Sequence, residues 1–246
     1  MSQAGNTGTT GGPGSEGVGM SSGATVPVRL AVFDFDGTSI AGNSPVLLVG
    51  YLAKQKMLSK RVLFRIMLWA VAYKLRLPQN ESWVRGLVFT AFEGRPVVEV
   101  NRFLEEFYDE KIAPLFRPQA DVAMRAHKEA GDVVMVVSAT FEPIILRAMQ
   151  RHPFQFQIST RMGISDDGTY TCKVEGRPVE GEEKLAAVRR MGDELFGEGK
   201  WVLESAYGDH HSDRAVLSAA RHAFAVSPDR PLLRTARERG WTVLKW

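Results

Sequence analysis

Short apolar runs alternate with amphipathic stretches along most of this chain. The runs have the length and the continuous hydrophobicity of strands buried on both faces. Helical spacing of apolar residues fills most of the intervals after residue 117. This alternation predicts an α/β fold, a doubly wound parallel sheet with helices on both faces. The expected strands lie near residues 29–34, 132–138, 155–159, 202–207, 222–226 and 241–245.

The stretch from residue 42 to about residue 125 breaks this alternation. It has the pattern of several helices without a convincing strand, and Pro45, Pro78, Pro96 and Pro114 divide it. We therefore expect an α-helical insertion between the first strand and the rest of the sheet. Farther along, Asp167-Gly168 predicts the turn of a β-hairpin that contains Cys172.

Two carboxylates stand at the end of the first expected strand, in Asp34-Phe35-Asp36-Gly37-Thr38. Acids this close ionise together at low cost only if a cation or a proton lies between them. Mg²⁺ is a suitable cation because it prefers oxygen ligands. Gly37 allows the backbone to turn sharply around the bound group. The alternative is an acidic turn without chemistry.

Three further polar motifs follow in order. Ser138 and Thr140 end the second expected strand, where they either bind a phosphate oxygen or cap a helix that starts near Phe141. Lys184 lies near the start of a helix, where a cation opposes the helix dipole and needs an anionic partner. Asp209 and Asp213 lie in a loop after the run at 202–207.

The ordered set DFDGT, VSAT, GEEK and AYGDHHSD resembles the four motifs of the haloacid dehalogenase-like (HAD) superfamily of phosphohydrolases. The resemblance is greatest to the phosphoserine-phosphatase-like branch, subclass IB, which carries a helical cap between the first and second motifs. It implies a Rossmann-like catalytic core at residues 28–41 and 126–246 and a cap at 42–125. It covers residues 28 to 246, although the cap contributes little.

The resemblance also implies roles for the site residues. Asp34 would be the nucleophile that forms an aspartyl-phosphate intermediate, and Asp36 would protonate the leaving alcohol and then activate water. Mg²⁺ would be held by the Asp34 carboxylate, the Asp36 backbone carbonyl and Asp209, with Asp213 close by. The residues expected to hold the phosphoryl group are Thr38, Ser138 and Lys184.

Two positions depart from the pattern of the family. His210 follows Asp209 where a small residue is usual, and with His211 it raises the alternative of a zinc site. We assign His210 no role, because the chain lacks other clustered nitrogen or sulfur ligands. Asn43 stands nine residues after Asp34, where phosphoserine phosphatases usually place a glutamate that holds the substrate amine. Phosphoserine is therefore weakened as the substrate.

The expected cap contains an unusual basic segment. No Asp or Glu occurs between Gly37 and Asn80, and an apolar run from Ile66 to Tyr73 lies among the cations. We favour a buried cap helix, with a helix on an anionic membrane surface as the alternative. In a continuous helix Arg61, Arg65 and Arg76 would share one stripe. The cations of this segment are Lys54, Lys56, Lys60, Arg61, Arg65, Lys74 and Arg76.

Composition narrows the function further. A net charge of +3 in 246 residues does not indicate nucleic-acid binding. The single cysteine excludes an intramolecular disulfide and fits the cytoplasm, with a peripheral membrane position as the alternative. Residues 1–27 are rich in Gly and Ser, and we expect a disordered tail without a signal peptide.

The sequence thus predicts an Mg²⁺-dependent phosphatase that acts on a small or lipid phosphate monoester. A phosphotransferase of the same fold and a non-catalytic membrane-surface or binding protein remain alternatives. A receiver-type signalling domain also uses a strand-end aspartate, Mg²⁺ and a lysine, but such a domain is about half this length and lacks a large insertion. A protein that had lost catalysis would lack one of its key acids or its lysine, whereas all are present here.

Overall fold

A seven-stranded, mostly parallel sheet forms the centre of the protein in a computed structural model that describes residues 26–74, 86, 88–177 and 179–246. The strand order is β4-β3-β2-β1-β5-β6-β7, and only β4 runs antiparallel to its neighbour. This order confirms the expected α/β fold. The strands are β1 (Val28–Asp34), β2 (Val133–Phe141), β3 (Phe156–Ile164), β4 (Tyr170–Glu175), β5 (Trp201–Gly208), β6 (His222–Val226) and β7 (Thr242–Leu244).

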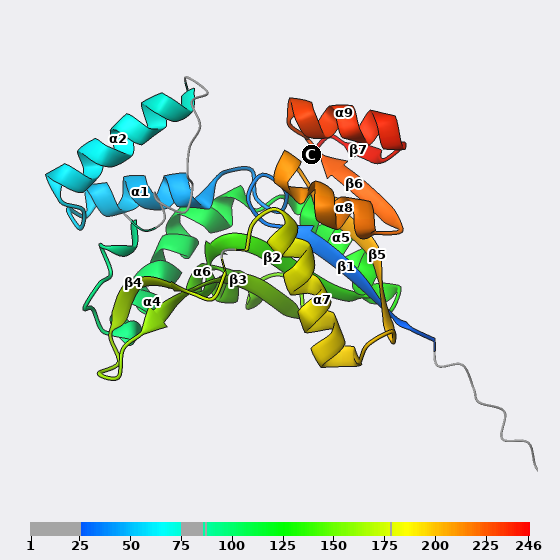
Figure 1. The fold of residues 1–246 in the computed structure, drawn as a ribbon, viewed down its shortest axis with the longest axis horizontal. Helices are drawn as coiled ribbons and strands as arrows, with labels where there is room; N and C mark the ends of the chain where they lie inside the picture. Colours follow the sequence, from blue (N-terminus) through cyan, green and yellow to red (C-terminus); the bar gives the residue numbers. More distant parts are fainter. Residues whose placement is uncertain (1–25, 75–85, 87, 178) are drawn as a thin grey trace, which may run out of the picture.

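Helices lie on both faces of this sheet and in the segment between β1 and β2 (Figure 1). The α-helices are α1 (Ser44–Lys54), α2 (Lys60–Lys74), α4 (Val97–Phe107), α5 (Pro118–Glu129), α6 (Glu142–Met149), α7 (Glu182–Phe196), α8 (Arg214–Ala219) and α9 (Arg230–Arg239). Short π- and 3₁₀-helical turns are η1 (Tyr108–Ile112), η2 (Ala113–Leu115) and η3 (His211–Asp213).

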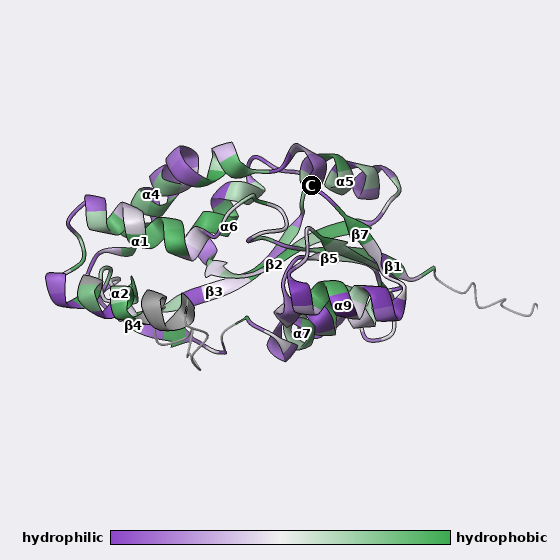
Figure 2. Ribbon diagram, turned by 90° about the horizontal axis from the view of Figure 1, so that it is seen from above, coloured by the Kyte–Doolittle hydropathy of each residue, from purple (hydrophilic) through white to green (hydrophobic). Residues whose placement is uncertain are grey.

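Alternate side chains of the central strands supply two separate hydrophobic cores. In β1, Ala31 and Phe33 join the core on the side of α5, α6 and the inserted helices, whereas Leu30 and Val32 join the core beneath α7, α8 and α9. Burial on both faces explains why β1 is a continuous apolar run. Figure 2 shows β1 and α1 in mainly hydrophobic colours, while α9 carries hydrophilic turns.

One detail of the sheet differs from the sequence expectations, and another agrees with them. The second strand continues to Phe141, so Ser138 and Thr140 lie within β2 and do not cap α6, which begins at Glu142 without a side-chain cap. The hairpin predicted at Asp167-Gly168 is confirmed, because β3 and β4 pair as antiparallel strands around that turn. Gly168 has a φ of +76°, a conformation that glycine adopts without strain.

Between β1 and β2 the described residues form helices and turns, without a further strand of the sheet. In Figure 1, α1 and α2 lie beside each other at the end of the molecule far from the start of β1. Toward the other end of the segment, α5 contacts β2, and the proposed boundary at residue 125 falls inside this helix. Arg76, Pro78 and residues 1–25 lie outside the described residues, so of the expected stripe only Arg61 and Arg65 can be placed, both on α2.

Candidate active site

The carboxyl ends of β1 and β5 bring acidic side chains together at one edge of the sheet. Asp34 is the last residue of β1, and Asp209 directly follows β5. Asp213 ends the short helix η3 in the next turn of the chain. One carboxylate oxygen from each of these three acids lies within 4.8 Å of the others, and this is the one such group found among the described residues.

Lys184 provides the positive charge in this acidic group. Its Nζ donates to Asp34 Oδ1 at 2.5 Å and to Asp213 Oδ1 at 2.6 Å. Only 6% of Lys184 and 8% of Asp34 is exposed, so both charges are largely removed from water. The expectation that Lys184 needs an anionic partner is therefore met by two carboxylates. A buried ion pair with several partners holds its members in fixed positions.

Burial and charge change the protonation of this group. Burial raises the pKa of Asp34 well above its ordinary value; the charge of Lys184 lowers it, but Asp213 and Asp209 raise it again. Burial and the neighbouring Asp213 raise the pKa of Asp209 to about 6. Burial alone would lower the pKa of Lys184, but the charges of Asp213 and Asp34 outweigh it and raise that pKa. When all three are ionised, the carboxylates carry more negative charge than one lysine balances, and this repulsion contributes to the raised pKa values of Asp34 and Asp209.

This excess of negative charge fits a divalent cation. The donors are all oxygens, the set that Mg²⁺ prefers. Gly37 lies so close to the Asp209 carboxylate that a Cβ at this position would meet Asp209 Oδ2 at 2.1 Å, and its φ of +80° also favours glycine. Thr38 Oγ1 donates to Asp209 Oδ1 at 3.1 Å. The turn after β1 therefore fixes Asp209, which begins the last motif.

Asp36 points to a different set of partners. Thr140 Oγ1 donates to Asp36 Oδ2 at 2.6 Å, and Ser44 contributes its backbone N–H to Oδ1 and its hydroxyl to Oδ2. Burial raises the pKa of Asp36, while the hydrogen bonds from Thr140 and Ser44 lower it. Asp36 is thus held apart from the acidic group, in surroundings that favour a transferable proton.

Sequence reasoning missed Ser44 and the role of Thr140. Ser44 is fully buried at the first residue of α1, so the inserted segment reaches directly into the site. The sequence did contain a signal for Ser44, because a serine at a helix start only eight residues after Asp36 can donate a hydrogen bond back to the Asp36 carboxylate.

Asn43 caps α1, because its side chain accepts a hydrogen bond from Val46 N at 3.1 Å. Ser138 follows Val137, the β2 partner of Asp34, and its Oγ accepts from Thr140 N.

His210 forms its hydrogen bonds with residues that closely follow it in the chain. Its Nδ1 accepts from Ser212 N at 3.3 Å, while Asp213 Oδ2 accepts from His210 N, and together these bonds form a capping box at η3. Within the described part of the chain, neither His210 nor His211 belongs to an acidic or metal-ligating group. The zinc alternative therefore gains no support.

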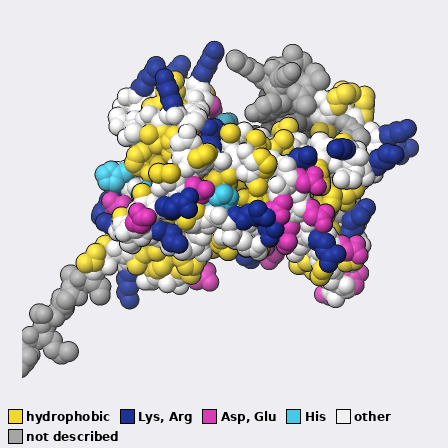
Figure 3. Space-filling view, turned by 180° about the vertical axis from the view of Figure 1, so that it is seen from behind, with side chains coloured by type: hydrophobic (Ala, Val, Ile, Leu, Met, Phe, Trp, Pro, Cys, Tyr) yellow, Lys and Arg dark blue, Asp and Glu magenta, His cyan; other side chains and the backbone are white. Residues whose placement is uncertain are grey.

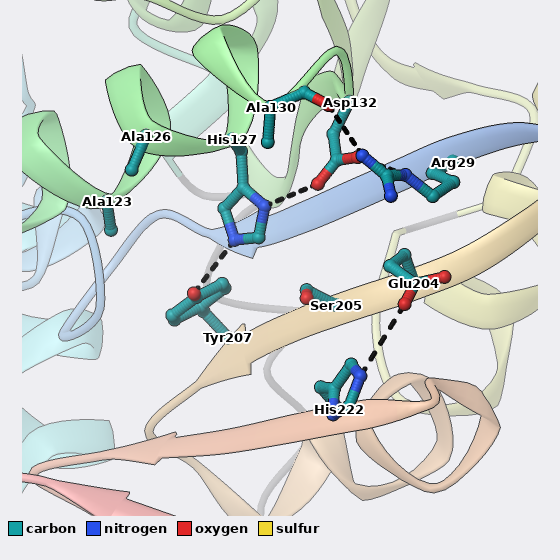
Figure 4. Close-up of a pocket in the computed structure, with 10 residues that line it drawn as sticks. All are labelled: Arg29, Ala123, Ala126, His127, Ala130, Asp132, Glu204, Ser205, Tyr207 and His222. Atoms are coloured by element: carbon teal, nitrogen blue, oxygen red, sulfur yellow. Dashed lines mark hydrogen bonds and ion pairs between the residues drawn. The ribbon is translucent and has the colours of Figure 1, made fainter.

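Behind the acidic group, aromatic rings join the two strands that carry it. Phe33 and Tyr207 are partners in the β1–β5 ladder, and their rings stack 4.1 Å apart. Tyr207 Oη lies 2.9 Å from His127 Nε2, and His127 Nδ1 lies 2.7 Å from Asp132 (Figure 4). Burial raises the pKa of Tyr207 to about 12, so its hydroxyl stays protonated. These contacts fix the strand ends that precede Asp34 and Asp209.

His127, Asp132 and Tyr207 also line a pocket of about 350 Å³ between α5 and the sheet. In Figure 4, Arg29, Glu204 and His222 also surround it, and Arg29 forms an ion pair with Asp132. Neither Asp34 nor Asp209 lines this pocket. The pocket is therefore separate from the acidic group.

Comparisons with known proteins agree with this arrangement. Residues 31–218 match the family of haloacid dehalogenase-like hydrolases. The chain is 30% identical over 217 residues to a phosphoserine phosphatase of Mycobacterium tuberculosis, a match that covers 87% of this chain and 69% of the relative. It is 28% identical over 235 residues to a histidinol-phosphatase of Neisseria meningitidis, covering 89% and 99% of the two chains.

Solved structures show the same fold. A protein with unknown function from Bordetella pertussis is similar with a TM-score of 0.79 and 26% identity, covering 89% of this chain and 98% of that one. A substrate-bound phosphoserine phosphatase complex has a TM-score of 0.59 at 17% identity and covers 88% and 92%, which supports the fold alone. The positions of the strand-end acids agree with the family match over most of the chain. We conclude that the chain belongs to the haloacid dehalogenase-like hydrolases and has phosphoserine-phosphatase-like relatives.

Proposed function

We propose that this protein is a Mg²⁺-dependent phosphomonoester hydrolase with Asp34 as its nucleophile. The observation that carries the proposal is the position of Lys184, which holds one oxygen of Asp34 and one of Asp213 at a single buried point. This arrangement fixes the orientation of the Asp34 carboxylate and leaves its second oxygen for attack on phosphorus. Fixed geometry of this kind contributes much of the rate acceleration in phosphoryl transfer.

The proposed reaction has two steps. A free oxygen of Asp34 attacks phosphorus in line, the P–O bond to the substrate alcohol breaks, and Asp36 gives its proton to the leaving oxygen. Water then attacks the phosphorus of the aspartyl-phosphate while Asp36 takes its proton, which releases phosphate and restores Asp34. The raised pKa of Asp36 supports the first step, because the group must carry a proton when the alcohol leaves.

Asp34, Asp209 and the Asp36 backbone carbonyl would hold Mg²⁺, with Asp213 close by. When bound, Mg²⁺ would neutralise charge on the phosphoryl oxygens and on the carboxylates. Lys184, Ser138 and Thr38 would contact the transferring phosphoryl group.

Two relatives suggest candidate substrates, because one is a phosphoserine phosphatase and the other is a histidinol-phosphatase. Asn43 argues against phosphoserine here, because its neutral amide offers no carboxylate to an amine and its oxygen already accepts a hydrogen bond from Val46 N. We propose a phosphate monoester whose alcohol contacts the inserted helices, either a small soluble ester or a lipid phosphate.

The test is Mg²⁺-dependent phosphate release by wild type and Asp34→Asn over a panel of phosphoserine, histidinol phosphate, other small monoesters and micellar lipid phosphates. We expect at least one ester to be turned over by wild type and none by Asp34→Asn. Full activity of Asp34→Asn, purified free of contaminating phosphatase, would overturn the mechanism. Phosphate transfer to an added alcohol, with little release to water, would favour a phosphotransferase.

A further inference from the structure

Helix α2 presents two faces of different character. On the inner face Ile66 is 8% exposed and contributes to the hydrophobic core, with Val62 packed beside it. On the outer face Phe64, Met67 and Leu68 are 55%, 54% and 51% exposed. The inner face of α2 thus packs against its neighbours, as expected of a cap helix, whereas the outer face exposes apolar side chains that this expectation did not include.

The three outer side chains form a continuous apolar stripe. Residues spaced by three and four positions lie on the same side of a helix, so Phe64 is adjacent to both Met67 and Leu68. The other large apolar side chains found exposed in the described residues are spread singly over different elements. Scattered exposed apolar residues are normal, whereas a contiguous group marks a surface that meets another apolar phase.

Basic side chains lie at the start of α2, before this stripe in the chain. Lys54, Lys56, Lys60 and Arg61 are all exposed at the end of α1, in the turn and at the start of α2. The dark blue side chains at the upper right of Figure 3 lie at this end of the molecule. No acidic residue occurs in the sequence from Gly37 to Asn80.

We propose that the outer face of α2, with the basic turn before it, docks the protein onto the surface of an anionic lipid bilayer. On such a bilayer, apolar side chains lie at the level of the headgroups and Lys and Arg side chains reach the lipid phosphates. The outer face of α2 supplies the apolar side chains, and the turn before it supplies the basic ones. A protein partner fits less well, because lysine is depleted in protein–protein interfaces. Within the described part of the chain, no helix is long and apolar enough to cross a membrane.

The proposal connects to the active site through α1 and does not depend on the proposed phosphatase activity. The first residue of α1, Ser44, binds Asp36, and its last residue, Lys54, belongs to the basic turn. A docked α2 would thus hold the amino end of α1, and with it the site, at a fixed place relative to the lipid surface.

The test is co-sedimentation of the purified full chain with vesicles. One vesicle set contains phosphatidylcholine alone, and the other contains phosphatidylcholine with one-third phosphatidylglycerol. The variants are Phe64→Gln with Met67→Gln, and Lys60→Gln with Arg61→Gln. The matched control is Val98→Gln with Arg102→Gln, which changes one exposed apolar and one exposed basic residue on α4, a helix that also carries glutamates.

We expect wild type to bind the anionic vesicles, to bind phosphatidylcholine much less, and to dissociate as salt is raised. Each α2 variant should lose about tenfold or more in partitioning. Each basic residue near such a surface contributes roughly fivefold, and the Phe64 and Met67 changes remove the apolar area that enters the headgroup region. The control should bind as wild type does. All variants should keep wild-type hydrolysis of a soluble ester, a readout that separates failure of docking from failure of the enzyme mechanism.

Three results would overturn the proposal. One is absence of binding to anionic vesicles, and another is equal binding by wild type and the α2 variants. The third is a wild-type dimer, seen by light scattering, that the Phe64 and Met67 changes convert to a monomer without affecting vesicle binding. This last result would assign the stripe to a second copy of the chain.

Discussion

The acidic site and the α2 face use charge in opposite ways. At the end of the sheet the charges of Asp34, Asp213 and Lys184 are buried and tied to one another, whereas the cations around α2 are exposed. Buried charges are costly unless partners and geometry are fixed, so the site tolerates little change. Exposed charges cost little, so the outer face of α2 can vary without loss of the fold. The proposed chemistry therefore lies where the charges are buried and paired.

The largest expected effect comes from Lys184→Met, which breaks the buried charge pairing. We expect kcat to fall by about 10²- to 10³-fold, because a charge that stabilises the transition state is lost. The free energy of unfolding should fall by about 3 kcal/mol, because the buried carboxylates lose their partner. Steady-state kinetics and urea unfolding measure the two effects.

A matched variant sharpens this result. Lys184→Met combined with Asp213→Asn removes one negative charge together with the positive one, and it should recover part of the stability without recovering activity. If Lys184→Met alone unfolds like wild type, the buried pairing does not stabilise the fold.

The second prediction uses the pKa of Asp209, which is raised to about 6 in the folded protein. A carboxyl group with a raised folded pKa stabilises the fold at low pH, and this stability is lost as pH rises through about 6. In metal-free protein, Asp209→Asn should therefore match wild type near pH 4. Near pH 7.5 it should be more stable by about 1 to 2 kcal/mol. Thermal unfolding at both pH values measures this difference.

Metal addition provides the control for the second prediction. Mg²⁺ should raise the melting temperature of wild type at neutral pH, since binding to the folded state stabilises it. It should raise that of Asp209→Asn less. Equal stabilisation of both proteins by Mg²⁺ would argue against Asp209 as a ligand.

The third prediction concerns the hydrogen bond from Thr140 to Asp36. Thr140→Val removes a donor that favours the ionised form, so the pKa of Asp36 should rise further. The alkaline limb of the kcat/KM profile should move to higher pH, with a loss in kcat/KM of about tenfold at neutral pH.

Thr160→Val is the control, because Thr160 is also a buried threonine, and it donates to the Ala139 carbonyl instead of a carboxylate. It should lower stability without moving the pH profile. A profile that moves equally in both variants would show that Thr140 acts only through packing.

The smallest effect is expected on the outer face of α2. Phe64→Gln should change the free energy of unfolding by less than about 0.5 kcal/mol, because the side chain is already more than half exposed. Ile66→Ala, on the inner face of the same helix, should cost about 2 to 4 kcal/mol. Chemical denaturation of the two variants tests whether the two faces of α2 differ as described. Comparable losses would show that Phe64 is buried in solution.

Much of the fold and site could be predicted from local sequence. The apolar run before Asp34 identified β1, and polar residues after the runs identified the strand ends. The hairpin at Asp167-Gly168 also followed from its turn residues. Strand β2 was expected to end near residue 138, however, because Ser and Thr are common at boundaries, whereas pairing with β3 extends it to Phe141. Pairing between strands outweighed a local preference.

What the sequence by itself determined is the identity and order of the chemical groups: paired acids after a buried run, a lysine at a helix start and two more acids in a later loop. Strand-end motifs are local, so they can be recognised without contacts. Only the tertiary structure decided that Lys184 joins Asp34 to Asp213 and that Ser44 and Thr140 hold Asp36. It also decided which side of α2 meets the core. These outcomes depend on packing between segments far apart in the chain, which local patterns do not specify.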